Sequence, residues 1–206
     1  MYKVFFNDRK VFLIDDFLNY FQNNDGLFYR YQNRLELLDL INFYNRLTKI
    51  NALYLFHYNI EELHKSFRAC FKNIDAAGGL VKNKNGEILI IKRRNKWDLP
   101  KGKVKKGESL HKASIREVSE ECGIDNIEIV QPLISTYHTY LIEGRLVLKK
   151  TYWFEMLYTG NRAPTPQIKE DITEVKWFKK TKLDEVIKNT YQLILDIFRH
   201  EKLVGL

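Results

Sequence analysis

The chain has 206 residues, of which 45% are hydrophobic and 29% are charged, and its formal net charge is +8 at pH 7. This composition excludes a disordered chain, and no apolar run approaches the roughly 18 residues of a membrane-spanning helix. The two cysteines, Cys70 and Cys122, cannot form a disulfide framework or a thiolate metal site. The first residues lack a signal-peptide pattern, so we expect a cytoplasmic, reducing location.

Residues 1–73 predict a small α/β module with ten basic and eight acidic side chains. The expected elements are strands over 2–6, 11–14 and 52–57 and helices over about 34–48 and 60–72. Asn59 is the expected N-cap of the second helix. The module holds no recognisable motif, which leaves substrate recognition and homodimer formation as alternative roles.

The pattern of apolar segments and turns changes near Ile74, so residues 74–206 are predicted to form a second domain. Its expected strands lie over 77–81, 88–91, 127–132, 135–142, 147–158 and 174–178. Residues 161–167 contain two of the four prolines and are expected to form a loop. Asp184 is the expected cap of the last helix.

Three glutamates, Glu117, Glu120 and Glu121, lie close together in the middle of this second part. On a helix they are spaced as i, i+3 and i+4 and share one face. Like charges at this spacing destabilise a helix by a few tenths of a kcal/mol per pair, so an offsetting cation is expected. Mg²⁺ takes oxygen ligands and bridges carboxylates to phosphates. A solvated acidic face is the alternative for an isolated cluster of this kind.

The surrounding residues predict a capped helix over about 110–122, with Ser109 as N-cap and Gly123 as C-terminal cap. Arg116 precedes Glu120 by four residues and is within reach of an ion pair with it. The three glutamates are expected opposite a buried side. That buried side is expected to consist of His111, Ile115, Val118 and Cys122.

The stretch GKVKKGESLHKASIREVSEECGI, from Gly102 to Ile124, resembles the Nudix box, G-x5-E-x7-R-E-U-x-E-E-x-G-U with U apolar, at every fixed position. The preceding AAGGLV…GEILIIKRR..KWDLPKGK resembles the first strands of that family, and the resemblance covers about residues 74–206. It implies an α/β/α sandwich around a mixed sheet. It also implies a hydrolase that uses Mg²⁺, or alternatively Mn²⁺, to cleave a diphosphate linked to another group.

The resemblance also assigns site residues. Its metal ligands would be Glu117, Glu120 and Glu121, with the carbonyl of Gly102 as a further ligand. The general base in this family is a glutamate of the box or an acid on a distant loop. The catalytic set predicted here is therefore Glu120, Glu170 and Arg116. An exposed acidic turn is the alternative interpretation of Glu170, and Glu108 is expected to tie the loop to the helix.

Basic residues gather around the predicted metal site, with twelve Lys or Arg against three Asp or Glu between Lys82 and Arg116. Such an excess suits a polyanionic substrate, although most lysines are simply solvated. The predicted phosphate ligands are Arg93, Arg94, Lys101, Lys103 and Lys150. Tyr137 is a candidate for stacking on a nucleobase, with a place in the core as the alternative.

The loop Leu99-Pro100-Lys101-Gly102 is similar to that of family members acting on dinucleoside polyphosphates and diphosphoinositol polyphosphates. We therefore expect a small polyphosphate substrate, with a dinucleoside polyphosphate favoured. A nucleotide-sensing module without catalysis is one alternative. Hydrolysis at the 5′ end of RNA is another, which the basic segment 82–106 permits. No RNA-binding motif is recognisable elsewhere, so nucleic acid is not the expected partner.

Overall fold

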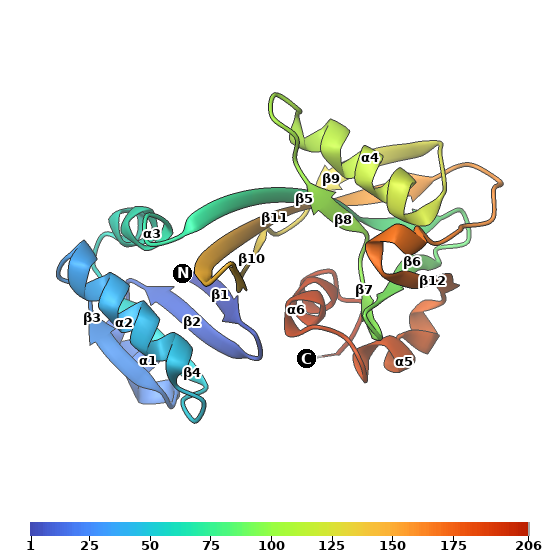
Figure 1. The fold of residues 1–206 in the computed structure, drawn as a ribbon. Coiled ribbons are helices and arrows are strands. Elements are labelled where there is room, and N and C mark those ends of the chain that lie inside the picture. Colours follow the sequence, from blue (N-terminus) through green and yellow to red (C-terminus); the bar gives the residue numbers. More distant parts are fainter. Residues whose placement is uncertain (206) are drawn as a thin grey trace. The chain divides into compact units, whose positions relative to one another are not determined.

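The computed structural model describes residues 1–205 and divides into two compact units (Figure 1). The N-terminal unit consists of Met1–Ile74 together with Tyr137–Lys150. The catalytic unit, so called because it contains the glutamate-rich helix, consists of Asp75–Thr136 and the chain from Thr151 onward. The predicted domain boundary at residues 73 and 74 stays a prediction, while the structure adds a distant segment to the N-terminal unit.

The sheet of the N-terminal unit has the order β11-β10-β1-β2-β4-β3. Its elements are β1 (Tyr2–Phe6), β2 (Arg9–Ile14), α1 (Phe17–Asn23), β3 (Leu27–Arg30), α2 (Arg34–Arg46), β4 (Ala52–Phe56), α3 (Ile60–Arg68), β10 (Thr136–Ile142) and the first part of β11 (Arg145–Tyr158). Strands β1 and β2 form the expected antiparallel hairpin, and β4 runs parallel to β2 and β3. The side chain of Asn59 accepts from the backbone of Glu62, which confirms the predicted cap of α3.

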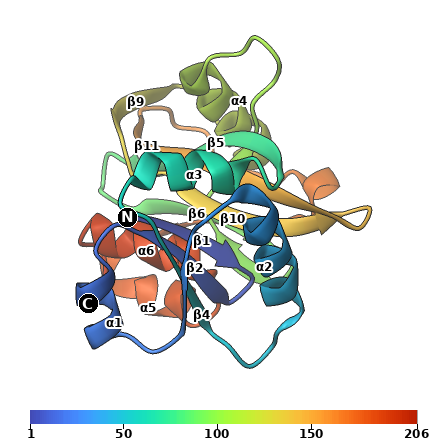
Figure 2. The ribbon, with the colours of Figure 1, turned by 90° about the vertical axis from the view of Figure 1, so that its left-hand side faces the viewer.

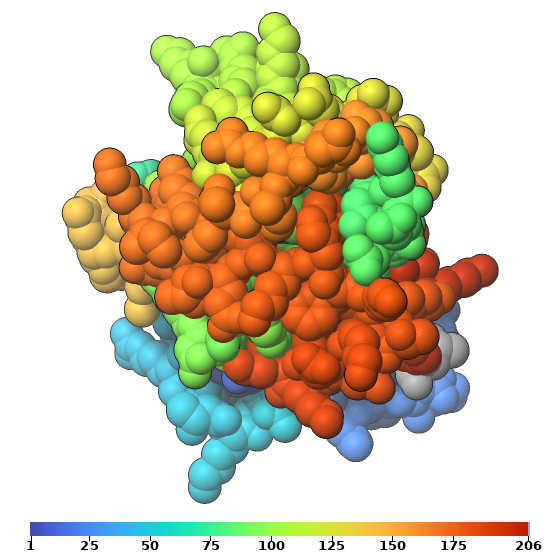
Figure 3. Space-filling view, turned by 90° about the vertical axis from the view of Figure 1, so that its right-hand side faces the viewer, coloured from blue at the N-terminus to red at the C-terminus, as the bar shows by residue number. Residues whose placement is uncertain are grey.

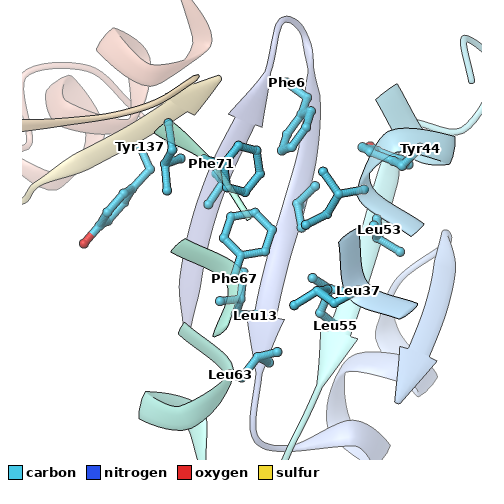
Figure 4. Close-up of a cluster of buried hydrophobic side chains, with 14 of the residues drawn as sticks. Phe6, Leu13, Leu37, Tyr44, Leu53, Leu55, Leu63, Phe67, Phe71 and Tyr137 are labelled. Carbon is cyan, nitrogen blue, oxygen red and sulfur yellow. The ribbon is translucent and has the colours of Figure 1, made fainter. Parts of the chain in front are cut away.

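Alternate residues of β2 and β4 point to opposite faces of this sheet. On one face, Leu13 and Leu55 pack with Leu37 of α2 and Phe67 of α3 in a large apolar core (Figure 4). On the other face, a smaller aromatic cluster includes Phe17 of α1. The helices therefore cover both faces of the sheet (Figure 2).

The catalytic unit is built on strands in the order β12-β6-β5-β11, to which three further strands, β7, β8 and β9, are added. Its elements are β5 (Lys72–Asn83), β6 (Ile88–Arg93), β7 (Lys96–Asp98), β8 (Lys101–Lys103), α4 (Leu110–Cys122), β9 (Ile127–Pro132), the end of β11, η1 (Ile168–Glu170), β12 (Ile172–Phe178), η2 (Lys180–Lys182), α5 (Leu183–Ile187) and α6 (Gln192–His200). The three-residue strands β7 and β8 were not expected, because so short a segment carries no periodicity.

Strand β6 shows how the layers of the catalytic unit are made. Ile88 and Ile90 pack in the cluster that contains Phe198 of α6. Leu89 and Ile91 pack in the cluster that contains Val118 of α4. Because adjacent strand residues point to opposite faces, α4 covers one face of the sheet and α5 with α6 covers the other. The predicted α/β/α sandwich is confirmed.

The last predicted helix is wrong in one respect, because the structure has two helices there. Asp184 does not cap either of them; it lies in the first turn of α5, where a negative charge favours the helix dipole. The N-caps are Lys182 and Tyr191, neither with a side-chain hydrogen bond. No helix within residues 1–205 is long and apolar enough to cross a membrane.

Candidate active site

Helix α4 begins and ends as its sequence predicts. The Ser109 hydroxyl accepts from the backbone N–H of Lys112 at 3.3 Å, and Gly123 ends the helix in the left-handed region with φ of 65°. Val118 and Cys122 are fully buried, as expected. The ring of His111 lies 4.9 Å from that of the core residue Phe154, as expected for this side of the helix, but His111 itself is exposed and not buried.

The three glutamates of α4 do not share one environment. The Glu120 side chain is 45% exposed, the Glu117 side chain is 14% exposed, and the Glu121 side chain is 2% exposed. The prediction that all three lie opposite the buried side is therefore wrong for Glu121. The reason is tertiary, because the strand β8 covers the position that a bare helix would leave open.

Glu121 is held by the backbone of β8. Its Oε2 accepts from the N–H of Lys101 at 2.9 Å, and its Oε1 lies 3.8 Å from a guanidinium nitrogen of Arg93. Burial raises the pKa of this carboxyl to about 7, against the opposing effect of the Lys101 charge. Because the charges of Arg93 and Lys101 do not offset the cost of burial, a further cation near this carboxylate would stabilise its charged form.

Gly102 brings the backbone of β8 against a second, partly buried carboxylate, Glu117. A Cβ atom at Gly102 would lie 1.8 Å from the Oε2 of Glu117, so a larger residue at this position would displace the Glu117 carboxylate. Burial raises the pKa of Glu117, although a hydrogen bond from Arg116 at 2.7 Å acts in the opposite direction. The two consecutive residues of β8 thus each meet one carboxylate of α4.

Arg116 joins α4 to the loop that precedes it. Its guanidinium donates to both oxygens of Glu108 at 2.8 Å and to the carbonyl of Lys103 at 3.1 Å. It also donates to Glu120 at 3.1 Å, which confirms the predicted ion pair. The hydrogen bonds from Arg116 lower the pKa of Glu108 to about 2. Glu108 therefore ties the loop to the helix as expected.

Lys101, a predicted phosphate ligand, has its side chain directed inward. Its Nζ forms an ion pair with Asp98 and a hydrogen bond to the carbonyl of Leu99, and its side chain is 8% exposed. Asp98 was not singled out from the sequence; its position three residues before the loop lysine is the signal that marks the pair. A phosphate-binding role for Lys101 stays a prediction.

The structure brings Arg93 together with Glu170, the predicted general base. The guanidinium of Arg93 donates to Glu170 at 3.0 Å while lying near Glu121. Arg94, in the left-handed region with φ of 50°, pairs instead with Asp171 at 3.1 Å on the surface. Of the adjacent arginines, Arg93 thus lies beside the carboxylates of the site.

The remaining predicted substrate ligands are dispersed. Lys103 is exposed on β8. Tyr137 and Lys150 belong to the N-terminal unit, where the Lys150 amine lies 5.6 Å from the Tyr137 ring. Tyr137 is buried in that unit's core, which supports the alternative of a core role. Nucleobase stacking by Tyr137 and phosphate binding by Lys150 stay predictions.

The donors around β8 suit a hard divalent cation in kind, since they are carboxylate and backbone oxygens. Among residues 1–205, no three acidic, histidine or cysteine side chains converge as a formed metal site. One guanidinium nitrogen of Arg116 donates to Glu117 at 2.7 Å and to Glu120 at 3.1 Å, and Glu120 is the most exposed of the three glutamates. The fit rests on the partly buried Glu117 and the buried Glu121, with Gly102 beside them.

Comparison with known proteins adds the family. Residues 72–197 match the NUDIX domain. The chain is 27% identical over 146 residues to the RNA pyrophosphohydrolase of Wolbachia pipientis subsp. Culex pipiens, covering 66% of this chain and 86% of that protein. It is 39% identical over 59 residues to the 8-oxo-dGTP diphosphatase of Escherichia coli, covering 26% of this chain and 46% of that protein.

One solved structure supports the fold over nearly two thirds of the chain. The Escherichia coli dihydroneopterin triphosphate pyrophosphohydrolase is similar with a TM-score of 0.50 at 16% identity. The match covers 63% of this chain and 95% of that protein.

Proposed function

The chain belongs to the Nudix family of pyrophosphohydrolases, and we propose that it cleaves a diphosphate linkage in a nucleoside polyphosphate, with a dinucleoside polyphosphate as the favoured substrate. The observation that carries this proposal is a buried carboxylate, Glu121, beside a partly buried one, Glu117, set against consecutive residues of β8. Such burial is costly for a fold, and it suits a site that takes up a cation together with its phosphate substrate. A cytoplasmic location is part of the proposal.

Glu117, Glu121 and the Gly102 backbone would hold Mg²⁺ or Mn²⁺, with Glu120 as a further ligand. The bound metal would neutralise phosphate charge and make a water molecule more acidic. Arg116 keeps the box loop and the carboxylates in place through Glu108 and Glu120. Its role is positioning, on which phosphoryl chemistry depends heavily.

We assign the proton transfer to Glu170 and the phosphate contact to Arg93. The Glu170 side chain is 49% exposed and is therefore accessible to a water molecule. Its partner Arg93 has a planar guanidinium group, whose N–H groups can donate two parallel hydrogen bonds to phosphate oxygens. In this proposal, Arg93 exchanges Glu170 for a substrate phosphate, which leaves the Glu170 carboxylate able to accept a proton.

The choice of substrate rests on the loop Leu99-Pro100-Lys101-Gly102, whose form is similar to that of dinucleoside polyphosphate hydrolases. RNA 5′-end hydrolysis is the second candidate. It is favoured by the RNA pyrophosphohydrolase from Wolbachia, since this chain covers 86% of that relative. Both substrates present the same chemistry, a diphosphate next to a nucleoside.

Phosphorus NMR of the products formed in ¹⁸O-labelled water tests the proposal. The panel contains a dinucleoside tetraphosphate, a nucleoside triphosphate, a 5′-triphosphorylated RNA and a capped RNA, each with and without Mg²⁺. We expect metal-dependent cleavage with one labelled phosphate among the products, fastest for the dinucleoside tetraphosphate. Turnover of RNA alone, falling steeply with salt, selects the second candidate instead.

The same panel separates an enzyme from a binding module. Tight binding of a nucleotide with no labelled product under any condition contradicts hydrolysis and favours nucleotide sensing. Cleavage that leaves every product phosphate unlabelled contradicts attack of water on phosphorus.

A further inference from the structure

A cavity of about 430 Å³ opens in the catalytic unit, between the turn that joins β5 to β6 and the loop that follows β11. Its principal side chains are Lys84, Asn85, Tyr158, Asn161, Arg162 and Trp177. None of them belongs to the predicted catalytic, metal or substrate residues. Figure 3 shows this face, with the green turn beside the orange segments that complete the cavity.

Two stacked aromatic side chains, Tyr158 and Trp177, form one surface of the cavity. The rings of Tyr158 and Trp177 are stacked with centroids 5.6 Å apart and planes inclined by 24°. Tyr158 is only 5% exposed, and its hydroxyl donates to the carbonyl of Arg162 at 2.8 Å. A Cβ atom at Gly160 would lie 2.8 Å from the Tyr158 ring, so the loop backbone closes tightly on it. The buried tyrosine thus supports the half-buried indole of Trp177.

The loop that forms one wall is fixed by backbone hydrogen bonds at both ends. Thr159 N–H donates to Asn126 at 3.1 Å, and Thr165 N–H donates to Cys122 at 2.8 Å. The opposite wall is a turn in which the Asn83 side chain accepts from the backbone of Asn85 at 2.9 Å. Because these walls are already ordered, a ligand entering the cavity would order little additional chain.

The charge of the cavity is positive. Lys84 and Arg162 contribute to its lining, and no acidic side chain does. Within the part of the chain that the structure describes, neither cation forms an ion pair with a carboxylate. Asn85 and Asn161 add amide groups, which both donate and accept hydrogen bonds. An aromatic surface, two cations and amides together match a flat heterocycle that carries an anion.

We propose that this cavity is a second nucleotide site, separate from the hydrolytic residues, in which a purine ring stacks on Trp177 and Lys84 and Arg162 bind the phosphate. Asparagine suits the hydrogen-bonding edge of adenine, so adenine nucleotides are the expected ligands. The ligand is a free mononucleotide or one unit of a single-stranded RNA, since both offer the same chemistry. The inference does not depend on which diphosphate the enzyme cleaves.

Binding is measured on the full chain labelled with ¹⁵N-tryptophan, in EDTA, so that metal-dependent turnover cannot interfere. The indole N–H signal of Trp177 is assigned by its loss in Trp177→Phe. We expect AMP and oligoadenylate to shift this signal. The signal of Trp153, which is buried and donates to Thr136 at 2.9 Å, should stay in place. An unmoved Trp177 signal, or an equal shift with inorganic phosphate alone, overturns the proposal.

A matched pair of variants tests the cations. Lys84→Ala/Arg162→Ala should weaken oligoadenylate binding by about tenfold or more at low salt, because two phosphate contacts are lost. Lys182→Ala/Lys188→Ala removes the same charge from exposed positions of the catalytic unit and should change binding by less than about twofold. Equal weakening by both pairs overturns the site.

Two further readouts complete the experiment. Tighter binding of oligoadenylate than of AMP identifies RNA as the ligand, and equal binding identifies the free nucleotide; either supports the cavity as a nucleotide site. Metal-dependent hydrolysis of a small substrate should persist in Lys84→Ala/Arg162→Ala. Its loss in a folded variant would place these residues in the hydrolytic site and overturn a separate one.

Discussion

The two units of this protein differ in what they bury. The core of the N-terminal unit is built from aliphatic and aromatic side chains, and Thr139 is its buried polar residue among those described. The catalytic unit buries Asp98, Lys101 and Glu121. Burying ionisable groups costs free energy unless they are paired, and here the pairing of Glu121 is incomplete. The N-terminal core thus lacks the cost of buried charge, whereas the catalytic unit carries that cost beside its proposed metal site.

The largest expected effect comes from Glu121→Gln. Gln is nearly isosteric and its oxygen can still accept from Lys101, but it cannot neutralise a cation. We expect the hydrolysis rate to fall by about 10²–10³-fold or more. The melting temperature of the metal-free protein should stay the same or rise, because a buried charge is removed.

Glu128→Gln is the control for this change, because Glu128 is exposed on β9. Its rate and melting temperature should match those of the wild type. Near-wild-type turnover by a folded Glu121→Gln variant would contradict the metal-binding assignment.

The second prediction concerns the core of the N-terminal unit. Phe67→Ala removes a fully buried ring of α3, and we expect a loss of about 3–5 kcal/mol in the free energy of unfolding. Urea denaturation followed by circular dichroism measures this loss. Phe43→Ala, at a residue that is 55% exposed, should change stability by less than about 0.5 kcal/mol.

The hydrolysis rate of Phe67→Ala, measured without urea, tests whether the N-terminal core contributes to catalysis as well as to stability. We expect folded Phe67→Ala to retain the wild-type rate, since no residue of the proposed metal site lies in its unit. A strong loss of hydrolysis rate in a fully folded Phe67→Ala variant would contradict a purely stabilising role for the N-terminal core.

The third prediction concerns the close approach of β8 to α4. In Gly102→Ala, the new methyl group would overlap the Glu117 carboxylate, so strand or side chain must move. Overpacking of this kind costs about 1–3 kcal/mol, and we expect both melting temperature and hydrolysis rate to fall. Gly205→Ala is the control, because a Cβ atom there meets nothing within 4 Å. An unchanged hydrolysis rate in Gly102→Ala would show that the reaction does not need the close packing of β8 against α4.

The smallest expected effect is that of Glu155→Gln, on the sheet of the catalytic unit. A hydrogen bond from Lys82 lowers the pKa of Glu155 from its ordinary 4.5, with burial opposing. A carboxyl with a lowered folded-state pKa stabilises the protein above the unfolded-state pKa and loses this contribution as the pH falls through the folded-state value. We expect Glu155→Gln to cost less than about 1 kcal/mol at pH 7.

Urea denaturation at neutral and at acid pH tests this sign. The difference in free energy of unfolding between wild type and Glu155→Gln should shrink as the pH falls below about 4.5, where the unfolded-state carboxyl is protonated, and toward the lower folded-state pKa. A difference that grows toward acid pH would contradict the assignment. Glu128→Gln again provides the exposed control.

The sequence by itself determined the features that depend on neighbours along the chain. The spacing of apolar residues, with Asn59, Ser109 and Gly123 as caps, located α3 and α4, because periodicity and capping are local properties. The four-residue spacing of Arg116 and Glu120 located their ion pair for the same reason. The complete box identified the family, and the family implied the sandwich.

Only the tertiary structure decided which of these side chains are buried. Glu120 and Glu121 are adjacent in sequence, yet Glu120 is exposed to solvent and Glu121 is covered by β8. A helical wheel represents α4 alone and therefore cannot predict this covering by another element. Lys101 is turned inward by Asp98, and the cavity beside Trp177 needs segments that lie far apart along the chain. Burial and pairing arise from long-range contacts, whereas spacing along one element specifies only which residues share a face.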